Sequence, residues 1–370
     1  MTAILSKLTP QLEKRHEPTR LAALRWICML LTTRRDALVT RLDDIFPPLL
    51  RTLSDPMEAV VRLDLEALAR IGSHETEFEA VLRHLIRLFA ADGRLLETRG
   101  SLIIRQLCVL LNGERIYQTF ARLLLGHEDL DFISVMVQTL NLILLTSSEL
   151  FEFRSLLKQS LLTDEGRDRF ISIYKAWCHN PVATFSLCLM AQCYELGSAL
   201  VFHFANIEVT VPFMMQIDKL VQLIESPIFI HLRLQLLEPQ RYPFLLKSLY
   251  GLMMLLPQSS AFSYLKTRLD AASAMGLLTC IPPSAFATST SAAAVGASAI
   301  ASAQADASVG KVAETQTLNF ADLLGEFCAT QQRHAALRKV VLKQSSLVGA
   351  QSAAAASASA AAGDDDQKGQ

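Results

Sequence analysis

The stretch SDPMEAVVRLDLEAL, residues Ser54–Leu68, places a turn signal directly before a helical pattern. Asp55 and Pro56 are residues that favour a turn or the start of a helix. Apolar side chains then follow at helical spacing, among them Val60, Leu63 and Ala67. This stretch therefore predicts a capped helix with one apolar face.

Three other stretches in the first half of the chain resemble this one. They are EPTRLAALRWICML (17–30), ADGRLLETRGSLIIRQL (91–107) and HEDLDFISVMVQTL (127–140). Superposing all four aligns Pro18, Asp55, Asp92 and Asp129, at constant intervals of 37 residues. A period of this length, built from paired helices, is typical of a solenoid, and the pattern resembles the class called HEAT repeats. The sequence predicts an all-α fold, an α-solenoid of HEAT-like helix pairs.

Arginines recur seven residues after the aligned positions, at Arg25, Arg62 and Arg99, and Met136 interrupts the series. They could bind phosphate or an acidic partner. The alternative is that each pairs with an acidic group of its own or a neighbouring repeat, which would form a ladder that fixes the stacking. We favour the structural ladder.

Composition narrows the classes of function. The 370 residues carry 35 basic and 36 acidic side chains, and 51% of all residues are hydrophobic. A nucleic-acid-binding protein usually shows a basic excess, which is lacking here. The seven cysteines are scattered, Asn-x-Ser/Thr is absent, and the first residues lack the apolar core of a signal peptide. We expect a protein of the reducing cytosol.

The second half is also predicted to be helical. SPIFIHLRLQLLEP (226–239) alternates apolar and polar residues as a strand would, but Ser226 before Pro227 favours a helix start. FLLKSLYGLMMLL (244–256) is apolar nearly all round, yet too short to span a bilayer. No transmembrane segment is predicted. We expect residues 161–281 to self-associate through such apolar helices.

Cys178, His179 and Asn180 stand in a row and raise the question of a thiol enzyme. Consecutive helical residues point about 100° apart, so these side chains would not converge on one another. Cys188 and Cys193 are five residues apart, and the chain has no Cys-x-x-Cys pair, so no metal or cofactor site is predicted. We interpret the two cysteines as core residues, and His179 with Asn180 as a helix C-terminal cap. No enzyme is predicted.

Several long stretches resemble one family. They are WCHNPVATFSLCL (177–189), IDKLVQLIESPIFIHLRLQLLEP (217–239), YPFLLKSLYGLMMLLPQSSAFSYLKTRL (242–269), LLETRGSLIIRQLCVLLN (95–112), ILLTSSELFEFRSLLK (143–158) and LNFADLLGEF (318–327). All are similar to the vacuolar-morphology scaffold of the phosphatidylinositol 3,5-bisphosphate complex. The similarity covers most of residues 50–269 and then 318–338. Compared with that family, the chain lacks roughly the amino-terminal half of the repeat array.

This resemblance implies a non-catalytic scaffold that assembles a FYVE-finger lipid kinase, which is a phosphatidylinositol 3-phosphate 5-kinase, with a Sac-domain phosphoinositide phosphatase. It also implies a homo-oligomer that is cytoplasmic and peripheral on endosomal and vacuolar membranes through its partners. The alternative is a generic HEAT-repeat transport adaptor with an unrelated cargo, since such repeats serve many partners. The expected partner-contact residues are Trp177, His179, Asn180, Tyr250, Met254, Phe320, Leu323, Leu324 and Phe327.

The predicted organisation has five parts. Residues 1–160 form HEAT-like repeats, and 161–281 form a carboxy-terminal domain for phosphatase binding and self-association. Residues 282–317 form a disordered Ala/Ser-rich linker, 318–343 an amphipathic helix, and 344–370 a disordered tail. Phe320, Leu323, Leu324 and Phe327 make one apolar stripe on that helix, so it needs a groove on the solenoid or on another subunit.

Overall fold

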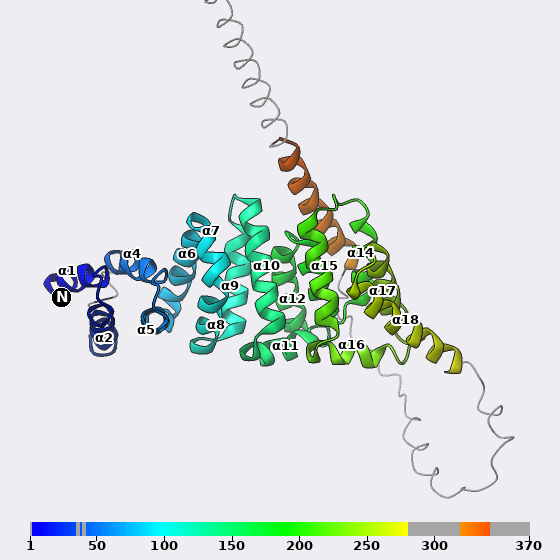
Figure 1. Cartoon of the computed structure of the whole chain (residues 1–370), viewed down its shortest axis with the longest axis horizontal. Coiled ribbons are helices and arrows are strands. Elements are labelled where there is room, and N and C mark those ends of the chain that lie inside the picture. The colour runs from blue at the N-terminus through cyan, green and yellow to red at the C-terminus, as the bar shows by residue number, and fades with distance from the viewer. Residues whose placement is uncertain (1, 35–37, 39–41, 280–318, 341–370) are drawn as a thin grey trace, which may run out of the picture. The chain divides into compact units, whose positions relative to one another are not determined.

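The computed structural model describes residues 2–34, 38, 42–279 and 319–340 (Figure 1). These residues form helices and connecting turns and contain no strand. The predicted all-α class is thereby confirmed. The expected disordered linker 282–317 and tail 344–370 lie outside the described residues.

The helices follow one another with short connections. They are α1 Thr2–Leu12, α2 Glu17–Thr33, α4 Leu42–Thr52, α5 Glu58–Gly72, α6 Glu75–Ala91, α7 Gly93–Leu95, α8 Ser101–Leu110, α9 Gly113–Leu125, α10 Leu130–Thr146, α11 Phe151–Lys158, α12 Asp164–Trp177, α13 Pro181–Met190, α14 Tyr194–Phe204, α15 Val211–Ile224, α16 Ile230–Gln235, α17 Pro243–Leu255 and α18 Ser260–Thr279. A π-helical turn, Leu96–Gly100, leads into α8, and 3₁₀ turns lie at Ser148–Leu150, Ser160–Leu162 and Pro227–Phe229. A last helix covers residues 320–340.

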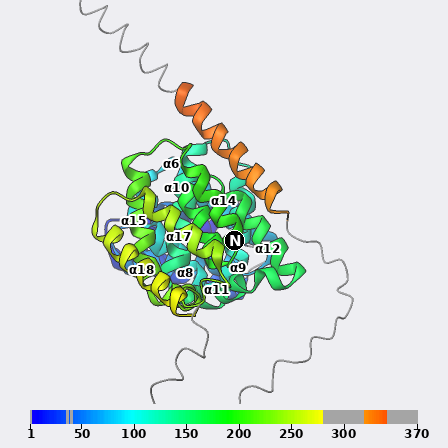
Figure 2. The same ribbon diagram turned by 90° about the vertical axis from the view of Figure 1, so that its right-hand side faces the viewer.

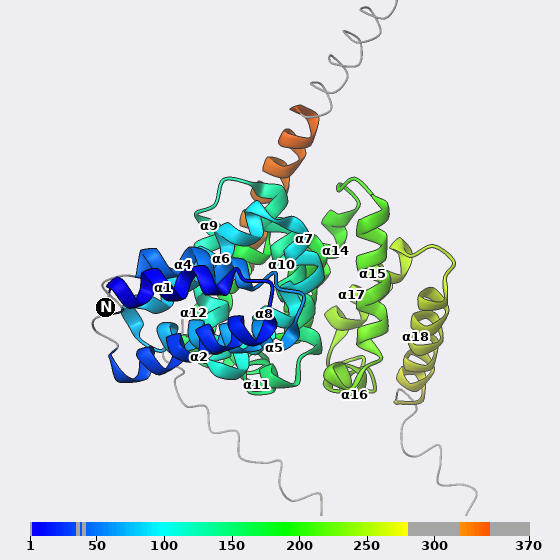
Figure 3. The ribbon, with the colours of Figure 1, turned by 60° about the vertical axis from the view of Figure 1, so that its left-hand side comes forward.

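Contacts divide the chain into two units. Unit 1 contains Met1–Asn141, Ser172–Thr184 and Asp322–Gln370, and unit 2 contains Leu142–Ile171 and Phe185–Ala321. In unit 1, α2 packs on α5 and α5 on α8, while α4 packs on α6 and α6 on α9 (Figure 3). The first and second helices of successive pairs thus stack in two rows. This is the HEAT-like solenoid arrangement that the 37-residue period predicts.

The aligned aspartates explain where the repeats begin. The Asp55 carboxylate accepts a hydrogen bond from the backbone N–H of Met57 at 2.9 Å, and that of Asp92 accepts one from Leu95 at 3.1 Å. The Asp129 carboxylate accepts from the N–H groups of Asp131 and Phe132, both at 3.0 Å. Each aspartate therefore satisfies backbone donors that have no partner within the following helix. The predicted capping role is confirmed at these three positions.

Unit 2 has its closest helix packing between α14 and α17. A Cβ atom added at Gly251 of α17 would lie 2.6 Å from Cγ1 of Val201 on α14, so only glycine allows this approach. Helix α18 is tied to α15 by the ion pair of Arg268 with Glu225 at 2.6 Å. It also contacts α17, where the Tyr250 hydroxyl lies 2.8 Å from that of Ser273. Figure 3 shows α14, α15, α17 and α18 side by side.

The ambiguous stretch 226–239 is helical, as predicted. The 3₁₀ turn Pro227–Phe229 leads directly into α16, with Phe229 and Leu232 buried. Arg233 donates to the carbonyls of Ile224 and Ser226, at 2.6 and 2.7 Å. These bonds satisfy carbonyl groups at and just after the end of α15. They also hold the turn between α15 and α16 closed.

Asp64 on α5 is an ionisable group buried in the core of unit 1. Its side chain is fully buried, and within the described residues no group hydrogen-bonds its carboxylate oxygens. The nearby Thr52 hydroxyl donates instead to the carbonyl of Leu49 at 2.6 Å. Burial raises the pKa of Asp64 well above its usual range, and the negative charge of Asp55 adds to this. Folding therefore raises the pKa of the Asp64 carboxyl relative to the unfolded chain.

Replacing Asp64 with asparagine is expected to raise the free energy of unfolding at pH 7 by about 1–3 kcal/mol. Because the pKa of Asp64 is higher in the folded state, the wild type loses stability as pH rises above about 4, where the unfolded carboxyl ionises. The amide cannot ionise, so the gain should shrink as pH falls toward 4. Urea unfolding at several pH values measures the gain in the free energy of unfolding and its dependence on pH. Glu58→Gln, at an exposed position of the same helix, should change stability by less than about 0.5 kcal/mol. A gain that is independent of pH would contradict this account.

Candidate protein-binding surfaces

The stretch around Cys178 is a packed corner of unit 1. Trp177 and Cys178 are fully buried, and burial raises the pKa of the Cys178 thiol. The Asn180 side chain accepts a hydrogen bond from the N–H of Ala183 at 3.0 Å, and the Thr184 hydroxyl donates to the carbonyl of Trp177 at 2.6 Å. Asn180 therefore caps the start of α13. The predicted C-terminal cap of the preceding helix is present as well, because the backbone N–H groups of His179 and Asn180 donate to the carbonyls of Ala176 and Trp177 at 3.3 and 2.9 Å.

The cysteines 188 and 193 are core residues, as predicted. Both are buried, and burial raises the pKa of the Cys193 thiol to about 12. Within the described ranges, no three His, Cys, Asp or Glu side chains lie close enough together to hold a metal ion.

The helix of residues 320–340 packs on this corner (orange ribbon in Figure 2). Leu323, Phe327, Thr330 and His334 are buried, and they fall on one face at intervals of four, three and four residues. Tyr174 donates from its hydroxyl to the carbonyl of Leu323 at 3.1 Å. The buried face of the helix is thus seated on the end of α12 and the turn that follows it.

Two further polar contacts hold the second half of this helix. The Gln331 side chain donates to the carbonyl of Cys178 at 2.7 Å. The Nδ1 atom of His179 lies 3.1 Å from the Nε2 atom of His334, and both rings are buried. Burial, followed by the charges of His334 and Arg333, lowers the pKa of His179 to about 4. We call this set of contacts, from Tyr174 to His179 with the facing residues of the helix, the helix seat.

The structure separates the predicted partner-contact residues into two groups. His179, Leu323 and Phe327 belong to the helix seat, and Trp177 and Asn180 lie beside it in the sequence; all five are buried. Tyr250 and Met254 lie on α17 in unit 2, and the Met254 side chain is 77% exposed. Leu324 and Phe320 are half-buried. The role of all these predicted residues in binding a partner remains a prediction.

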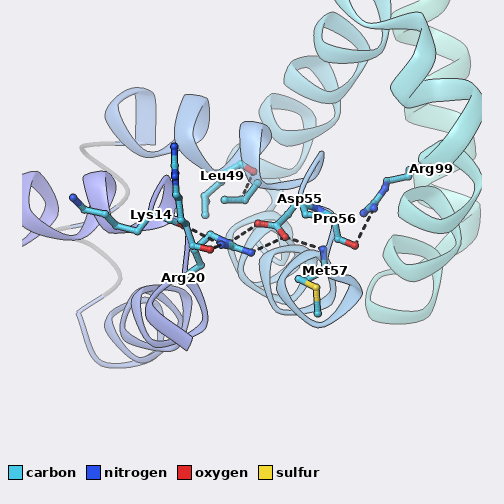
Figure 4. Close-up of polar contacts among 9 residues, drawn as sticks. Lys14, Arg20, Leu49, Asp55, Pro56, Met57 and Arg99 are labelled. Carbon is cyan, nitrogen blue, oxygen red and sulfur yellow. Dashed lines mark hydrogen bonds and ion pairs between the residues drawn. The ribbon is translucent and has the colours of Figure 1, made fainter. Parts of the chain in front are cut away.

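The repeat arginines lie in different surroundings. Arg62 pairs with Glu58 of its own helix at 2.8 Å, and Arg99 donates to the carbonyl of Pro56 in the preceding repeat at 3.4 Å. Arg25 is exposed. A further link between neighbouring repeats runs through Arg20, whose Nε lies 2.6 Å from Oδ2 of Asp55 (Figure 4). Arg20 also donates to the carbonyls of Lys14 and Arg15, at 2.9 and 2.8 Å.

Sequence reasoning missed Arg20 and His334. Arg20 lies outside the arginine series of period 37, so the repeat gave no reason to select it. His334 falls on the same helical face as Leu323 and Phe327, and continuing that face by two turns would have found it. Its partner His179 is 155 residues away in sequence, so no local pattern connects the two.

Unit 2 contains a small pocket of about 210 Å³. Its lining includes Gln192, Tyr194, Tyr242, Phe244 and Phe320. Gln192 has a φ of 61°, which is uncommon for a residue with a side chain. Its side chain accepts from Gln235 at 2.7 Å, and Gln235 in turn accepts from the Tyr194 hydroxyl. These bonds hold the strained turn between α13 and α14 in place.

Four exposed apolar side chains lie within a short stretch of the sequence, on α14, on α15 and in the connection between them. Phe202 is 77% exposed, Val211 74% and Met215 67%. Val209, in the connection itself, is also exposed. We call these four residues the α14–α15 patch. Exposed apolar side chains of this size are candidates for contact with another protein.

Among the described residues, no single helix has the length and apolar character needed to cross a membrane. One bent pair, Leu130–Thr146 with Ser148–Leu162, meets these criteria by length and composition.

Comparison with known proteins adds to this geometry. Residues 93–272 match the family model described as vacuolar protein 14 C-terminal Fig4p binding. The chain is 50% identical over 268 residues to the protein VAC14 homolog of Arabidopsis thaliana, and 46% identical over 273 residues to that of Schizosaccharomyces pombe. It is 35% identical over 269 residues to vacuole morphology and inheritance protein 14 of Saccharomyces cerevisiae.

These matches cover 72–73% of this chain and only 30–36% of each relative, so the chain spans about a third of their length. The stacked helix pairs define a helical-repeat protein. Over 72–73% of its length the chain is similar to the vacuolar protein 14 family, and residues 93–272 match that family's C-terminal Fig4p-binding model.

Proposed function

We propose that this chain is a non-catalytic scaffold that binds a Sac-domain phosphoinositide phosphatase through residues 93–272. The scaffold assembles this phosphatase with a FYVE-finger phosphatidylinositol 3-phosphate 5-kinase. It thereby regulates the synthesis and turnover of phosphatidylinositol 3,5-bisphosphate on endosomal and vacuolar membranes. The match of residues 93–272 to the Fig4p-binding family model carries this proposal.

The side chains of the matched region support binding rather than chemistry as its role. Burial raises the pKa values of the Cys178 and Cys193 thiols, which disfavours their nucleophilic thiolate forms. The four residues of the α14–α15 patch lie within residues 93–272, and their apolar side chains are exposed. We assign the phosphatase contact to this patch.

Kinase assembly and self-association are further parts of the proposal. Met254 and Phe244 of α17 are exposed apolar side chains, which supports a contact between copies through α17. By contrast, α13, the other apolar helix of this region, buries nine of its ten residues within the chain. Membrane association is proposed to be peripheral and to depend on the bound enzymes.

The test is co-expression of the full chain with the Sac-domain phosphatase, followed by size-exclusion chromatography and native mass measurement. We expect one complex, and we expect the double variant Phe202→Glu with Met215→Glu to lose the phosphatase while keeping its melting temperature. Trp26→Glu is the matched control. This side chain is 54% exposed but lies outside residues 93–272, so binding should persist.

Failure of the wild-type chain to bind the phosphatase would overturn the proposal. If the double variant still binds, the proposal survives for the region, but the assignment to the α14–α15 patch is wrong. Adding the lipid kinase to the same samples tests the assembly, and the native mass gives the number of copies.

A further inference from the structure

The contact between His179 and His334 joins two parts of the chain that are 155 residues apart. The facing ring nitrogens are 3.1 Å apart, and the two residues are only 4% and 3% exposed. At this distance one nitrogen carries the hydrogen and the other accepts it. Both facing nitrogens cannot carry a proton without losing the bond. The contact therefore requires at least one neutral ring.

The charged groups around the two histidines shift the pKa values of their rings. On the helix of residues 320–340, the guanidinium groups of Arg333 and Arg338 lower the pKa of His334, in addition to burial. The carboxylate of Asp131 on α10 acts in the opposite direction. Arg333 and His334 also lower the pKa of His179. For His334, two cationic side chains thus disfavour the protonated ring and one anionic side chain favours it. Burial disfavours the charged form of both rings.

The other polar contacts of the helix seat are insensitive to mild acid. The Tyr174 hydroxyl donates to a backbone carbonyl, and so does the Gln331 amide. Neither group gains a proton between pH 8 and 5. The apolar contacts of Leu323 and Phe327 do not titrate at all. Within the seat, the histidine pair is the contact that responds to pH in this range.

We propose that the buried pair of His179 and His334 is an acid-sensitive latch, which holds the helix of residues 320–340 in its seat at neutral pH and releases it as pH falls toward 5. Release exposes Tyr174, Cys178 and His179 at the helix seat and frees the apolar face of the helix for another partner. This regulation goes beyond the scaffold function and does not depend on it.

The direction of the pKa shifts determines how docking of the helix depends on pH. A histidine whose pKa is lower when the helix is docked stabilises docking at high pH, and this stabilisation is lost as pH falls below the ordinary value of about 6.5. For His179, with a docked pKa of about 4, the docking equilibrium should fall roughly 30-fold between pH 7.5 and 5. The pKa of His334 is also lowered, so it adds to the loss.

Hydrogen exchange of the full chain at pH 7.5, 6 and 5, corrected for the intrinsic exchange rate, tests the latch. We expect protection of residues 320–334 to fall at least 30-fold more than that of α5, which lies in the same unit. The double variant His179→Gln with His334→Gln should show no such extra fall. His231→Gln is the matched control. Burial also lowers the pKa of this histidine to about 4, but it lies in unit 2, so the extra fall should remain.

Equal protection of residues 320–334 at pH 7.5 and 5 would overturn the proposal. If the double variant does not dock at any pH, the ring resonances of the wild type decide the question. Titration of both rings below pH 6 supports the latch, and titration of both near pH 6.5 in the docked protein refutes it.

Discussion

Replacing Asp55 with alanine is expected to lower the free energy of unfolding by about 3–5 kcal/mol. The side chains of Asp55 and Arg20 are only 7% and 9% exposed, and the Nε–Oδ2 distance is 2.6 Å. Removing the carboxylate leaves the Arg20 guanidinium almost buried, with only the carbonyls of Lys14 and Arg15 as partners. The N–H of Met57 also loses its acceptor. Urea unfolding followed by circular dichroism measures the change.

The matched control for Asp55 is the exposed ion pair of Arg62 with Glu58, whose side chains are more than half exposed. Arg62→Ala should cost at most about 0.5 kcal/mol, because water solvates both charges well. Equal losses for Asp55→Ala and Arg62→Ala would mean that the link between Arg20 and Asp55 is no stronger than a surface ion pair.

Phe327→Asp is expected to detach the helix of residues 320–340 from its seat. The Phe327 side chain is only 1% exposed, so the change removes a buried aromatic ring and places a carboxylate in an apolar site. The first effect alone typically costs about 3–5 kcal/mol, and an unpaired buried charge adds to it. Hydrogen exchange should show fast exchange in residues 320–340, with the helices of unit 2 unchanged.

Leu337→Asp is the matched control on the same helix. Leu337 is 47% exposed and lies beyond the last buried residue, His334. It should leave the exchange of residues 320–334 unchanged. Slow exchange of residues 320–334 in the Phe327→Asp variant would show that the helix is held by contacts other than those of its buried face.

Local sequence patterns predicted much of the fold. The interval of 37 residues, with aspartate at three of its four aligned positions, predicted the helix pairs because each aspartate caps the turn that starts a repeat. The stripe of Leu323 and Phe327 predicted that the last helix needs a groove. Such features depend on residues within one or two helical turns of each other, and these residues appear in the sequence as a periodic pattern.

Contacts between distant segments could not be predicted in the same way. The pairing of His334 with His179 and that of Arg20 with Asp55 depend on how whole helices pack. Asn180 shows the limit within a local pattern. A residue before proline can cap the helix that ends, the helix that begins, or both. Asn180 does both, because its backbone N–H donates to the carbonyl of Trp177 and its side chain accepts from Ala183.

The return of residues 322–340 to unit 1 has a consequence for the order of folding. Tyr174 and Leu323 are 149 residues apart, and closing a chain segment of that size costs about 4 kcal/mol in entropy. The helix therefore reaches its seat after the local helix pairs have formed. During synthesis, Tyr174, Cys178 and His179 leave the ribosome long before the helix of residues 320–340 that contacts them. The unfinished chain thus exposes a site with the shape of its own last helix, which a chaperone or a neighbouring chain can occupy first.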